Sequence, residues 1–326
     1  MHNLRRYSNT LDMLVKIHGK LIETGRLMWD LLTLSDTSQG YPNAHYLKIW
    51  NYLPRAAQLS GPGYTFGRFI YRRSRMYQKR EPCEYTRFLR LRPQLEVAQQ
   101  VVLQMPQSAS IRIAVLGCST GAELYSFLWR IRSARPDLKI VPVGVDIASS
   151  ALDVARAGTY SCEAQEVEGL SEQQIEALFV KHGESLKVRD WISEGVTWVN
   201  ADACDPKLVE IVGYQDIVVA NNFLIHMFPP EDEASLRNII RLLLPGGYLF
   251  THGVDIDVRM RVSRDLGLIP VRFKIEEQHN AMDPEKFNQW PWHWCGRETL
   301  DKSSPDWELR YSTVLQMPRR ESHNAR

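Results

Sequence analysis

The sequence predicts an α/β protein with a doubly wound, mostly parallel sheet of seven strands, a helical N-terminal region and a small inserted subdomain. Three observations predict it. The apolar run Ile113–Leu116 has the length of a buried strand, breaks at a glycine turn from Gly117 to Gly121, and is followed by apolar residues at helical spacing. Similar runs recur downstream, separated by helix-length segments, which is the pattern of parallel sheets. Several runs end in polar residues, as strands do at the ligand-binding edge of such a sheet.

Composition narrows the class of protein. Of 326 residues, 44% are hydrophobic and 24% charged, which are ordinary values for a globular chain. The net charge of +2 does not indicate nucleic-acid binding, and no apolar run reaches the roughly 18 to 20 residues that span a bilayer. The start lacks the apolar core of a secretion signal, and the five cysteines are scattered without a C-x-x-C pair. We expect a cytoplasmic protein with no metal site, no membrane span and no nucleic-acid partner.

The N-terminal region, residues 1–82, is expected to be helical, because Leu14, Ile17 and Leu21 recur at helical spacing. Its end overlaps the most basic segment of the chain, residues 68–92, in which arginines alternate with aromatic residues. Three interpretations remain open for this segment. It binds an acidic partner, it supplies arginines to a cleft, or it is a solvated helix face.

A second domain is expected over residues 83–326, with elements that alternate between helix and strand. In chain order we expect helix 93–104, strand 113–116, helix 124–131, strand 140–147, helix 148–157, strand 196–203, strand 214–222, helix 230–244, strand 248–252, helix 258–266, strand 269–275 and strand 311–317. Proline near the start of helix 93–104 suits a first turn, and Pro245-Gly246-Gly247 is expected to end helix 230–244.

Two segments interrupt this alternation. Residues 158–195 are expected to form the small inserted subdomain, with a helix over 170–179 that Ser171 and Gln174 cap, and a short strand near 185–192. Residues 276–310 form an aromatic-rich extension that contains the cluster Trp290–Trp294. This cluster is either a lid or acceptor pocket wall, or ordinary packing.

The glycine turn indicates the type of ligand. Its spacing, Gly117-x-x-x-Gly121, lacks the second and third glycines of the dinucleotide fingerprint, so a dehydrogenase is disfavoured. Glu123 lies just inside the following helix, where a carboxylate repels phosphate and suits a cationic ligand. S-adenosylmethionine is the commonest cationic nucleoside cofactor. The alternative is an ordinary strand–turn–helix with a surface glutamate.

Further candidates follow the other strands. Asp146 ends the second strand, where a carboxylate accepts hydrogen bonds from ribose hydroxyls or caps the next helix. Asp202 ends the third strand and either accepts from an adenine amino group or closes a turn. Asn221, Asn222 and His226 follow the central strand at the edge where the ligand is expected.

Several motifs together resemble the chemotaxis-receptor glutamate methyltransferases and their wider relatives, over Cys83 to His252. The matching stretches are Thr86-Arg-Phe-Leu-Arg90, Ser119-Thr-Gly-Ala-Glu-Leu-Tyr-Ser126, Val145-Asp-Ile147, Ala155-Arg-Ala-Gly-Thr-Tyr160 and Asn222-Phe-Leu-Ile-His-Met-Phe228. This resemblance implies a Rossmann-like class I methyltransferase fold and S-adenosyl-L-methionine as cofactor.

The resemblance also implies a set of site residues. With the glycine turn included, the predicted cofactor contacts are Thr86, Arg90, Gly117, Thr120, Gly121, Glu123, Asp146, Asp202, Ala203, Asn221 and Asn222. Three positions depart from the family pattern: Asn221 replaces an arginine, His226 a tyrosine and Asp202 an asparagine. The first two departures weaken any transfer of glutamate specificity to this chain.

The implied reaction is in-line displacement at the sulfonium methyl by an acceptor oxygen, from a carboxylate or a hydroxyl. Orientation supplies most of the rate, an effect worth up to about 7 to 11 kcal/mol. An ionised carboxylate needs no base, and Arg90 would orient it. A hydroxyl needs one, and His226 is the candidate unless it is a packing residue. Two alternatives remain: a protein-glutamate O-methyltransferase of a chemotaxis-like signalling system, or a cofactor-binding regulator without catalysis.

Overall fold

The computed structural model describes residues 44–58, 60–76, 85–227, 231–281 and 300–319. The chain divides into two compact units between Ser74 and Arg75. Several sequence-based expectations lie outside the described residues: the helices before residue 44, the basic residues Lys79 and Arg80, and the tryptophan cluster Trp290–Trp294.

The described part of the first unit is helical. It contains α2 (Ala44–Tyr52), α3 (Arg55–Gln58) and α4 (Gly61–Met76). Aromatic rings join α2 to α4: Tyr46 meets Phe69 edge to face at 5.3 Å, and Trp50 lies 6.1 Å from Phe66. The glycine and proline residues at 61–63 form the first turn of α4, where proline costs no backbone hydrogen bond.

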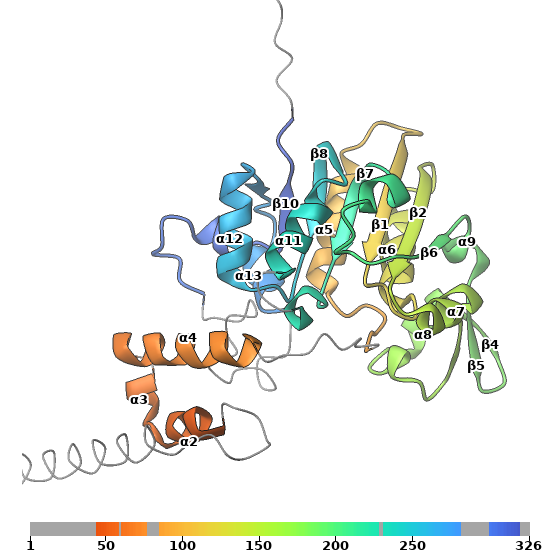
Figure 1. The fold of residues 1–326 in the computed structure, drawn as a ribbon. Coiled ribbons are helices and arrows are strands. Elements are labelled where there is room, and N and C mark those ends of the chain that lie inside the picture. The colour runs from red at the N-terminus through yellow and green to blue at the C-terminus, as the bar shows by residue number, and fades with distance from the viewer. Residues whose placement is uncertain (1–43, 59, 77–84, 228–230, 282–299, 320–326) are drawn as a thin grey trace, which may run out of the picture. The chain divides into compact units, whose positions relative to one another are not determined.

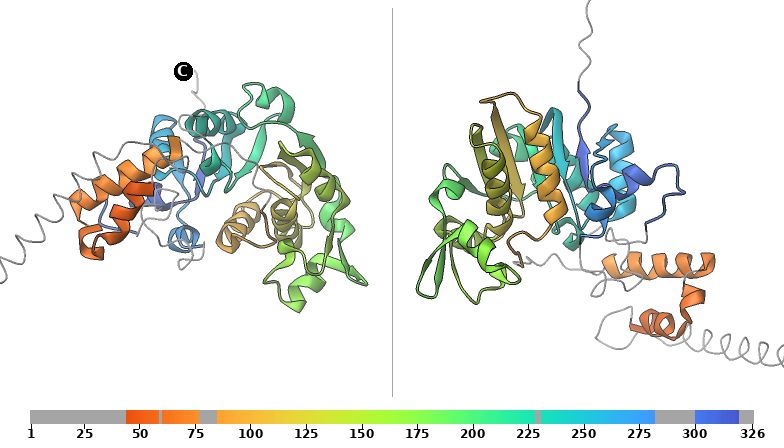
Figure 2. Two further views of the ribbon diagram at one scale, coloured as in Figure 1. Left: turned by 60° about the horizontal axis from the view of Figure 1, so that its bottom comes forward. Right: turned by 180° about the vertical axis from the view of Figure 1, so that it is seen from behind.

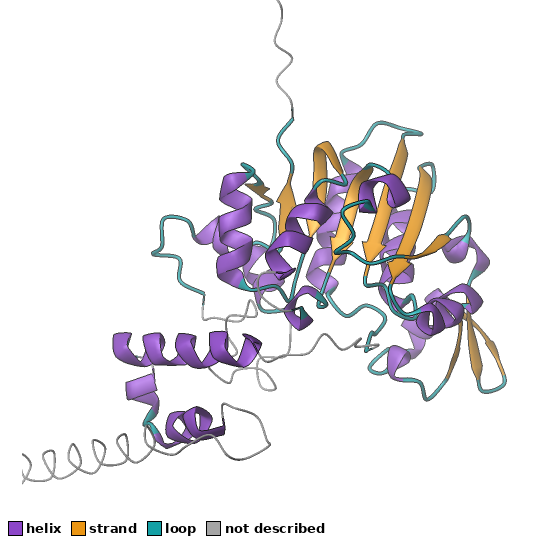
Figure 3. Cartoon of the chain, in the orientation of Figure 1, coloured by secondary structure: helices purple, strands orange, loops and turns teal. Residues whose placement is uncertain are grey.

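The second unit is built on a seven-stranded sheet, as the sequence predicts (Figures 1 and 3). The strand order is β6 (Thr197–Asn200), β2 (Lys139–Asp146), β1 (Ser110–Leu116), β7 (Gln215–Ala220), β8 (Leu243–Phe250), β10 (Val314–Gln316) and β9 (Ile269–Pro270). The first five strands run parallel, and β10 is antiparallel to both of its neighbours. The order reverses at β1, between β2 and β7, which is where ligands bind in such sheets.

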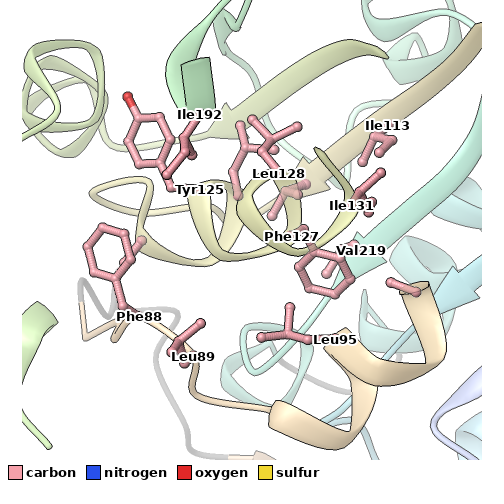
Figure 4. Close-up of a cluster of buried hydrophobic side chains, with 14 of the residues drawn as sticks. Phe88, Leu89, Leu95, Ile113, Tyr125, Phe127, Leu128, Ile131, Ile192 and Val219 are labelled. Carbon is pink, nitrogen blue, oxygen red and sulfur yellow. The ribbon is translucent and has the colours of Figure 1, made fainter. Parts of the chain in front are cut away.

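Helices cover both faces of the sheet, so the prediction of a doubly wound fold is confirmed (Figure 2). Side chains of β1 alternate between two apolar clusters: Ile113 and Val115 belong to one, Ala114 and Leu116 to the other. The first cluster includes residues of α5 (Arg92–Leu103), α6 (Ala122–Ala134) and α7 (Ser149–Ala157), and the second includes residues of α10 (Leu208–Val212), α11 (Glu231–Ile240) and α12 (Ile256–Asp265). Figure 4 shows the first cluster, where α6 packs its apolar residues between the sheet and α5.

A second, three-stranded antiparallel sheet lies within residues 159–188. It consists of β3 (Thr159–Ser161), β5 (Ser185–Val188) and β4 (Phe179–His182). Helix α8 (Glu172–Leu178) precedes β4 and begins with the predicted capping box, in which Ser171 and Gln174 satisfy each other's backbone N–H groups. Phe179 packs edge to face on Phe88 at 4.7 Å, which ties this sheet to the segment before α5.

Several element boundaries differ from the sequence-based predictions. The short strand predicted near 185–192 ends at Val188, because helix α9 (Asp190–Ser193) follows it. The helix predicted over 230–244 ends at Ile240, and the predicted terminator Pro245-Gly246-Gly247 lies inside β8 instead. Gly246, with φ +82°, lets the strand bulge there. The strand predicted over 269–275 is reduced to Ile269–Pro270, because Ile275 opens helix α13 (Ile275–His279). Tyr311 ends helix α15 (Trp307–Tyr311) rather than starting the last strand.

No helix among the described residues combines the length and the apolar character needed to cross a lipid bilayer.

Candidate functional site

A pocket opens at the carboxyl ends of β1 and β7, where the strand order reverses. Its lining residues are Tyr85, Thr86, Arg90, Gly117, Ser119, Glu123, Asn221, Asn222, Phe223 and His226. Seven of the residues predicted from the sequence are therefore together in one pocket. They come from three segments: the residues before α5, the turn after β1 with the first turn of α6, and the residues after β7.

The turn after β1 has a backbone that favours glycine. Gly117 and Gly121 have φ of +63° and +90°, and Ser119 between them has φ +49°. A Cβ atom on Gly117 would lie 2.6 Å from the Phe223 ring, and one on Gly121 would lie 2.9 Å from Trp198. Both glycines are therefore needed for the close packing of the turn against its neighbours.

Asp146, at the end of β2, holds this turn in place. Its Oδ2 accepts a hydrogen bond from the N–H of Ser119 at 2.7 Å, and its Oδ1 accepts from the N–H of Ala148 at 2.9 Å. Helix α7 has Ala148 as its N-cap and no side-chain cap, so the interpretation of Asp146 as a helix cap is wrong. The ribose contact of Asp146 stays a prediction.

Glu123, in the first turn of α6, is the acidic group of the pocket. Its Oε1 accepts a hydrogen bond from Nδ2 of Asn221 at 2.9 Å. Burial raises the pKa of Glu123 from 4.5 to about 7, although the Asn221 hydrogen bond and the positive charge of Arg90 both oppose the shift. A cationic ligand in the pocket would therefore stabilise the ionised carboxylate.

Arg90 belongs to a turn with a constrained backbone. Leu89, its neighbour, is buried and left-handed with φ +54°, which is rare for a bulky residue, and its N–H donates to Ser126 Oγ at 2.9 Å. The Arg90 guanidinium lies 5.3 Å over the Tyr85 ring, within the range of a cation–π contact. Thr86, which also lines the pocket, is buried. Backbone conformation and ring stacking together fix where the guanidinium lies.

The residues after β7 form the opposite wall. Asn222 is left-handed with φ +62°, its N–H donates to the His252 carbonyl at 2.7 Å, and its Oδ1 lies 3.1 Å from His252 Nδ1. His226 closes the short helix η2 (Leu224–His226) at the edge of the pocket. Ser119 and Asn222, in two walls of the pocket, are thus both non-glycine residues with a left-handed backbone. Such a conformation persists where the surrounding structure holds the backbone in place.

Five predicted contacts do not line the pocket: Thr120, Gly121, Asp146, Asp202 and Ala203. The Thr120 hydroxyl donates to the buried Glu166 carboxylate at 2.9 Å. Asp202 Oδ1 accepts from the Cys204 N–H at 2.8 Å, and Ala203 is buried with its carbonyl bonded to Asn238. Their predicted roles toward a cofactor are untested.

The structure adds three lining residues that the sequence analysis did not single out: Tyr85, Ser119 and Phe223. Each is next to a predicted site residue in the sequence, and this neighbouring position is the signal from which it could have been predicted. Within the described residues, no group of three or more histidine, cysteine, aspartate or glutamate side chains is placed to hold a metal ion.

Residues 84–255 match the family model described as CheR methyltransferase, SAM binding domain. The chain is 29% identical over 178 residues to the probable biofilm formation methyltransferase WspC of Pseudomonas putida, covering 53% of this chain and 41% of that protein. It is 26% identical over 188 residues to an uncharacterized 104.1 kDa protein of Rhodobacter capsulatus, covering 55% of this chain and 19% of that protein. The chain thus spans less than half the length of either curated relative.

Among solved structures, SAM-bound CalS10, an amino pentose methyltransferase from Micromonospora echinaspora, aligns with a TM-score of 0.31 and 20% identity. The alignment covers 50% of each chain. At this TM-score the likeness says nothing about activity.

Proposed function

The chain belongs to the CheR methyltransferase family, and on that premise we propose that it transfers a methyl group from S-adenosylmethionine to an oxygen atom of an acceptor. The observation that carries this proposal is the pocket in which Glu123, Asn221 and Arg90 gather beside the glycine turn at the point where the strand order reverses. When bound, the cofactor supplies an electrophilic methyl group on a sulfonium, and the side chains bind, orient and exclude water.

The residues of the pocket fit this cofactor. Glu123 offers a carboxylate to the ammonium group, and the missing Cβ of Gly117 lets the Phe223 ring lie against the glycine turn as part of the pocket lining. Asp146 would accept from the ribose hydroxyls while it holds the turn through Ser119. A carboxylate near the N-terminus of α6 disfavours a phosphate group, which argues for this cofactor over a dinucleotide.

A carboxylate is the acceptor that Arg90 favours, because a guanidinium orients a carboxylate and an ionised carboxylate attacks without a base. A protein glutamate side chain in a chemotaxis-like signalling system is the acceptor that the family suggests. The second candidate, a hydroxyl, is favoured by His226 at the edge of the pocket. A regulator that binds the cofactor without turnover is the remaining alternative, which a methyl-transfer assay decides.

Binding of the cofactor is the first test. Calorimetric titration of wild type with S-adenosylmethionine and S-adenosylhomocysteine is expected to give micromolar affinity. In Asp146→Ala the affinity should fall about 10- to 100-fold, because one or two hydrogen bonds to a charged group are lost. The matched control is Asp153→Ala on α7, an exposed residue whose side chain pairs with Arg156. Absence of binding to wild type would contradict the proposal.

Substitution of His226 distinguishes the two acceptors. With a carboxylate acceptor, His226→Phe should leave kcat within about threefold of wild type, because no proton has to be removed. With a hydroxyl acceptor, kcat should fall about 100-fold or more at neutral pH, the contribution typical of a general base. Turnover with each acceptor class is measured with a labelled methyl group, and an unchanged kcat on hydroxyl acceptors would exclude His226 as the base.

Three further proposals concern the binding partner of the protein, its location in the cell and the boundaries of its domains. We propose an acidic partner for the basic segment 68–92, of which Arg72 on α4 is exposed, and a cytoplasmic location. We further propose that the catalytic domain extends over 83–326, with 158–195 as its inserted subdomain and 276–310 as its extension.

A further inference from the structure

A buried chain of polar side chains leads away from Glu123 into the protein. Asn221 Nδ2, which donates to Glu123, also donates to Gln94 Oε1 at 2.7 Å. Gln94 Nε2 donates to the Thr313 hydroxyl at 3.0 Å, and this hydroxyl donates to Gln278 Oε1 at 3.2 Å. All four residues beyond Glu123 are at most 4% exposed.

Backbone groups fix the direction of every bond in this chain. The N–H of Thr313, which can only donate, bonds to Gln278 Oε1 at 3.0 Å, and Gln278 Nε2 donates to the carbonyl of Phe273 at 2.6 Å. Gln278 Oε1 is therefore an acceptor, so the Thr313 hydroxyl donates to it and accepts from Gln94. Gln94 then presents its Oε1 to Asn221. The amide of Asn221 consequently points its N–H group at Glu123 and cannot reverse without breaking the chain.

We propose that Gln94, Thr313 and Gln278 are positioning residues, which hold the Asn221 amide so that it donates to Glu123, the carboxylate assigned to the ammonium group of the cofactor. The inference rests on the proposed function. None of the three lines the pocket, and they come from α5, from the residue before β10 and from α13. A reversed Asn221 would turn its carbonyl oxygen toward the carboxylate, which repels it.

The physical consequence is testable on Glu123 itself. A donated hydrogen bond favours the ionised carboxylate, so its loss raises the pH at which Glu123 titrates. The other charged group that acts on Glu123 is Arg90, and the thiol of Cys118 lies near enough for Glu123 to act on it. Neither belongs to the polar chain, so substitutions in the chain leave both in place.

Thr313 allows a matched pair of substitutions. Thr313→Val has nearly the same shape and removes the hydroxyl that joins Gln94 to Gln278, whereas Thr313→Ser keeps it. Gln94→Met interrupts the chain at a second point. The titration of Glu123 is followed by carbon NMR of the labelled carboxyl group in ligand-free protein, with Glu123→Gln used for assignment. S-adenosylmethionine affinity is measured at pH 7 on the same samples.

We expect the titration midpoint of Glu123 to rise by about half to one pH unit in Thr313→Val and Gln94→Met, and to stay unchanged in Thr313→Ser. Cofactor affinity at pH 7 should fall about three- to tenfold in the first two variants. An unchanged midpoint in folded Thr313→Val would overturn the inference, since a purely structural role lowers stability without moving the titration. If the midpoints shifted but wild type bound no cofactor, the role of these polar side chains in cofactor binding would be rejected together with the proposed function.

Discussion

Glu123→Gln is expected to weaken S-adenosylmethionine binding about 100- to 1,000-fold at pH 7.5. Glutamine keeps the shape of the side chain and, through its Oε1, the hydrogen bond from Asn221, so the pocket is preserved. What is lost is the negative charge that faces a cationic ligand, and removing one partner of a partly buried charge pair costs about 3 to 5 kcal/mol. The measurement is calorimetric titration.

The pH dependence of cofactor binding is an independent test of the ionisation of Glu123. Because the pKa of Glu123 is raised to about 7, wild type must release a proton to bind a cation at pH 6. Its affinity should therefore rise from pH 5.5 to pH 7.5, by up to about tenfold per pH unit below 7. In Glu123→Gln the affinity should be independent of pH over this range.

The stability of the ligand-free protein should fall as the pH rises, whereas its affinity for the cofactor should rise. The folded pKa of Glu123, about 7, lies above its ordinary value of 4.5, so the protonated carboxyl is the form that the fold favours. The stability associated with that form is present below pH 4.5 and is lost as the pH rises through 7. Glu123→Gln should be more stable than wild type at pH 8, by on the order of 1 to 2 kcal/mol after allowance for its partial exposure, and the difference should vanish near pH 4.5.

Thermal unfolding checks this, with an expected rise in Tm of about 2 to 6 °C at pH 8. The control is Glu172→Gln, an exposed glutamate in the first turn of α8, for which neither binding nor the pH profile of Tm should change. A variant that lost binding but gained no stability would show that Glu123 is charged and well solvated in the free protein, contrary to our account.

The local pattern of the sequence was sufficient to predict the fold and part of the candidate site. The apolar run before Gly117, the helical spacing after Gly121 and the acidic end of β2 are properties of neighbouring residues, so periodicity and turn chemistry reveal them. The capping box of α8 was predicted for the same reason. The bulge inside β8 was not predicted, because Pro245-Gly246-Gly247 commonly ends a helix. Only the pairing of β8 with β7 shows that these residues form a bulge within a strand.

The part of the site that depends on distant residues could not be predicted from one sequence. Gln94 and Asn221 are 127 positions apart, and nothing in either neighbourhood indicates that their amides pair. Judged by its neighbours alone, Gln94 is an ordinary polar residue of the predicted helix 93–104. The raised pKa of Glu123 is equally hidden, since it arises from burial that the folded chain creates. The sequence was enough to predict the side chains that we propose bind the cofactor, and the structure was needed to find those that we propose orient them.

Gly117→Ala is the second substitution with a large expected effect, a loss of cofactor binding below detection together with about 2 to 4 kcal/mol of stability. Two costs add at this position. The backbone has φ +63°, which costs a residue with a Cβ about 1 to 2 kcal/mol. The new Cβ would also lie 2.6 Å from Cδ1 of Phe223, so this ring, which lines the pocket, would have to move and the shape of the pocket would change.

Gly183→Ala separates these two costs. Gly183 lies in the turn between β4 and β5 with nearly the same φ, +60°, but no atom lies within 4 Å of the position that a Cβ would take. It should lose about 1 to 2 kcal/mol in denaturant unfolding and bind the cofactor like wild type. The excess loss in Gly117→Ala then measures the contact with Phe223. Wild-type affinity in Gly117→Ala would mean that the ring moves away from the pocket freely, and that the close approach of turn and ring is not what shapes the site.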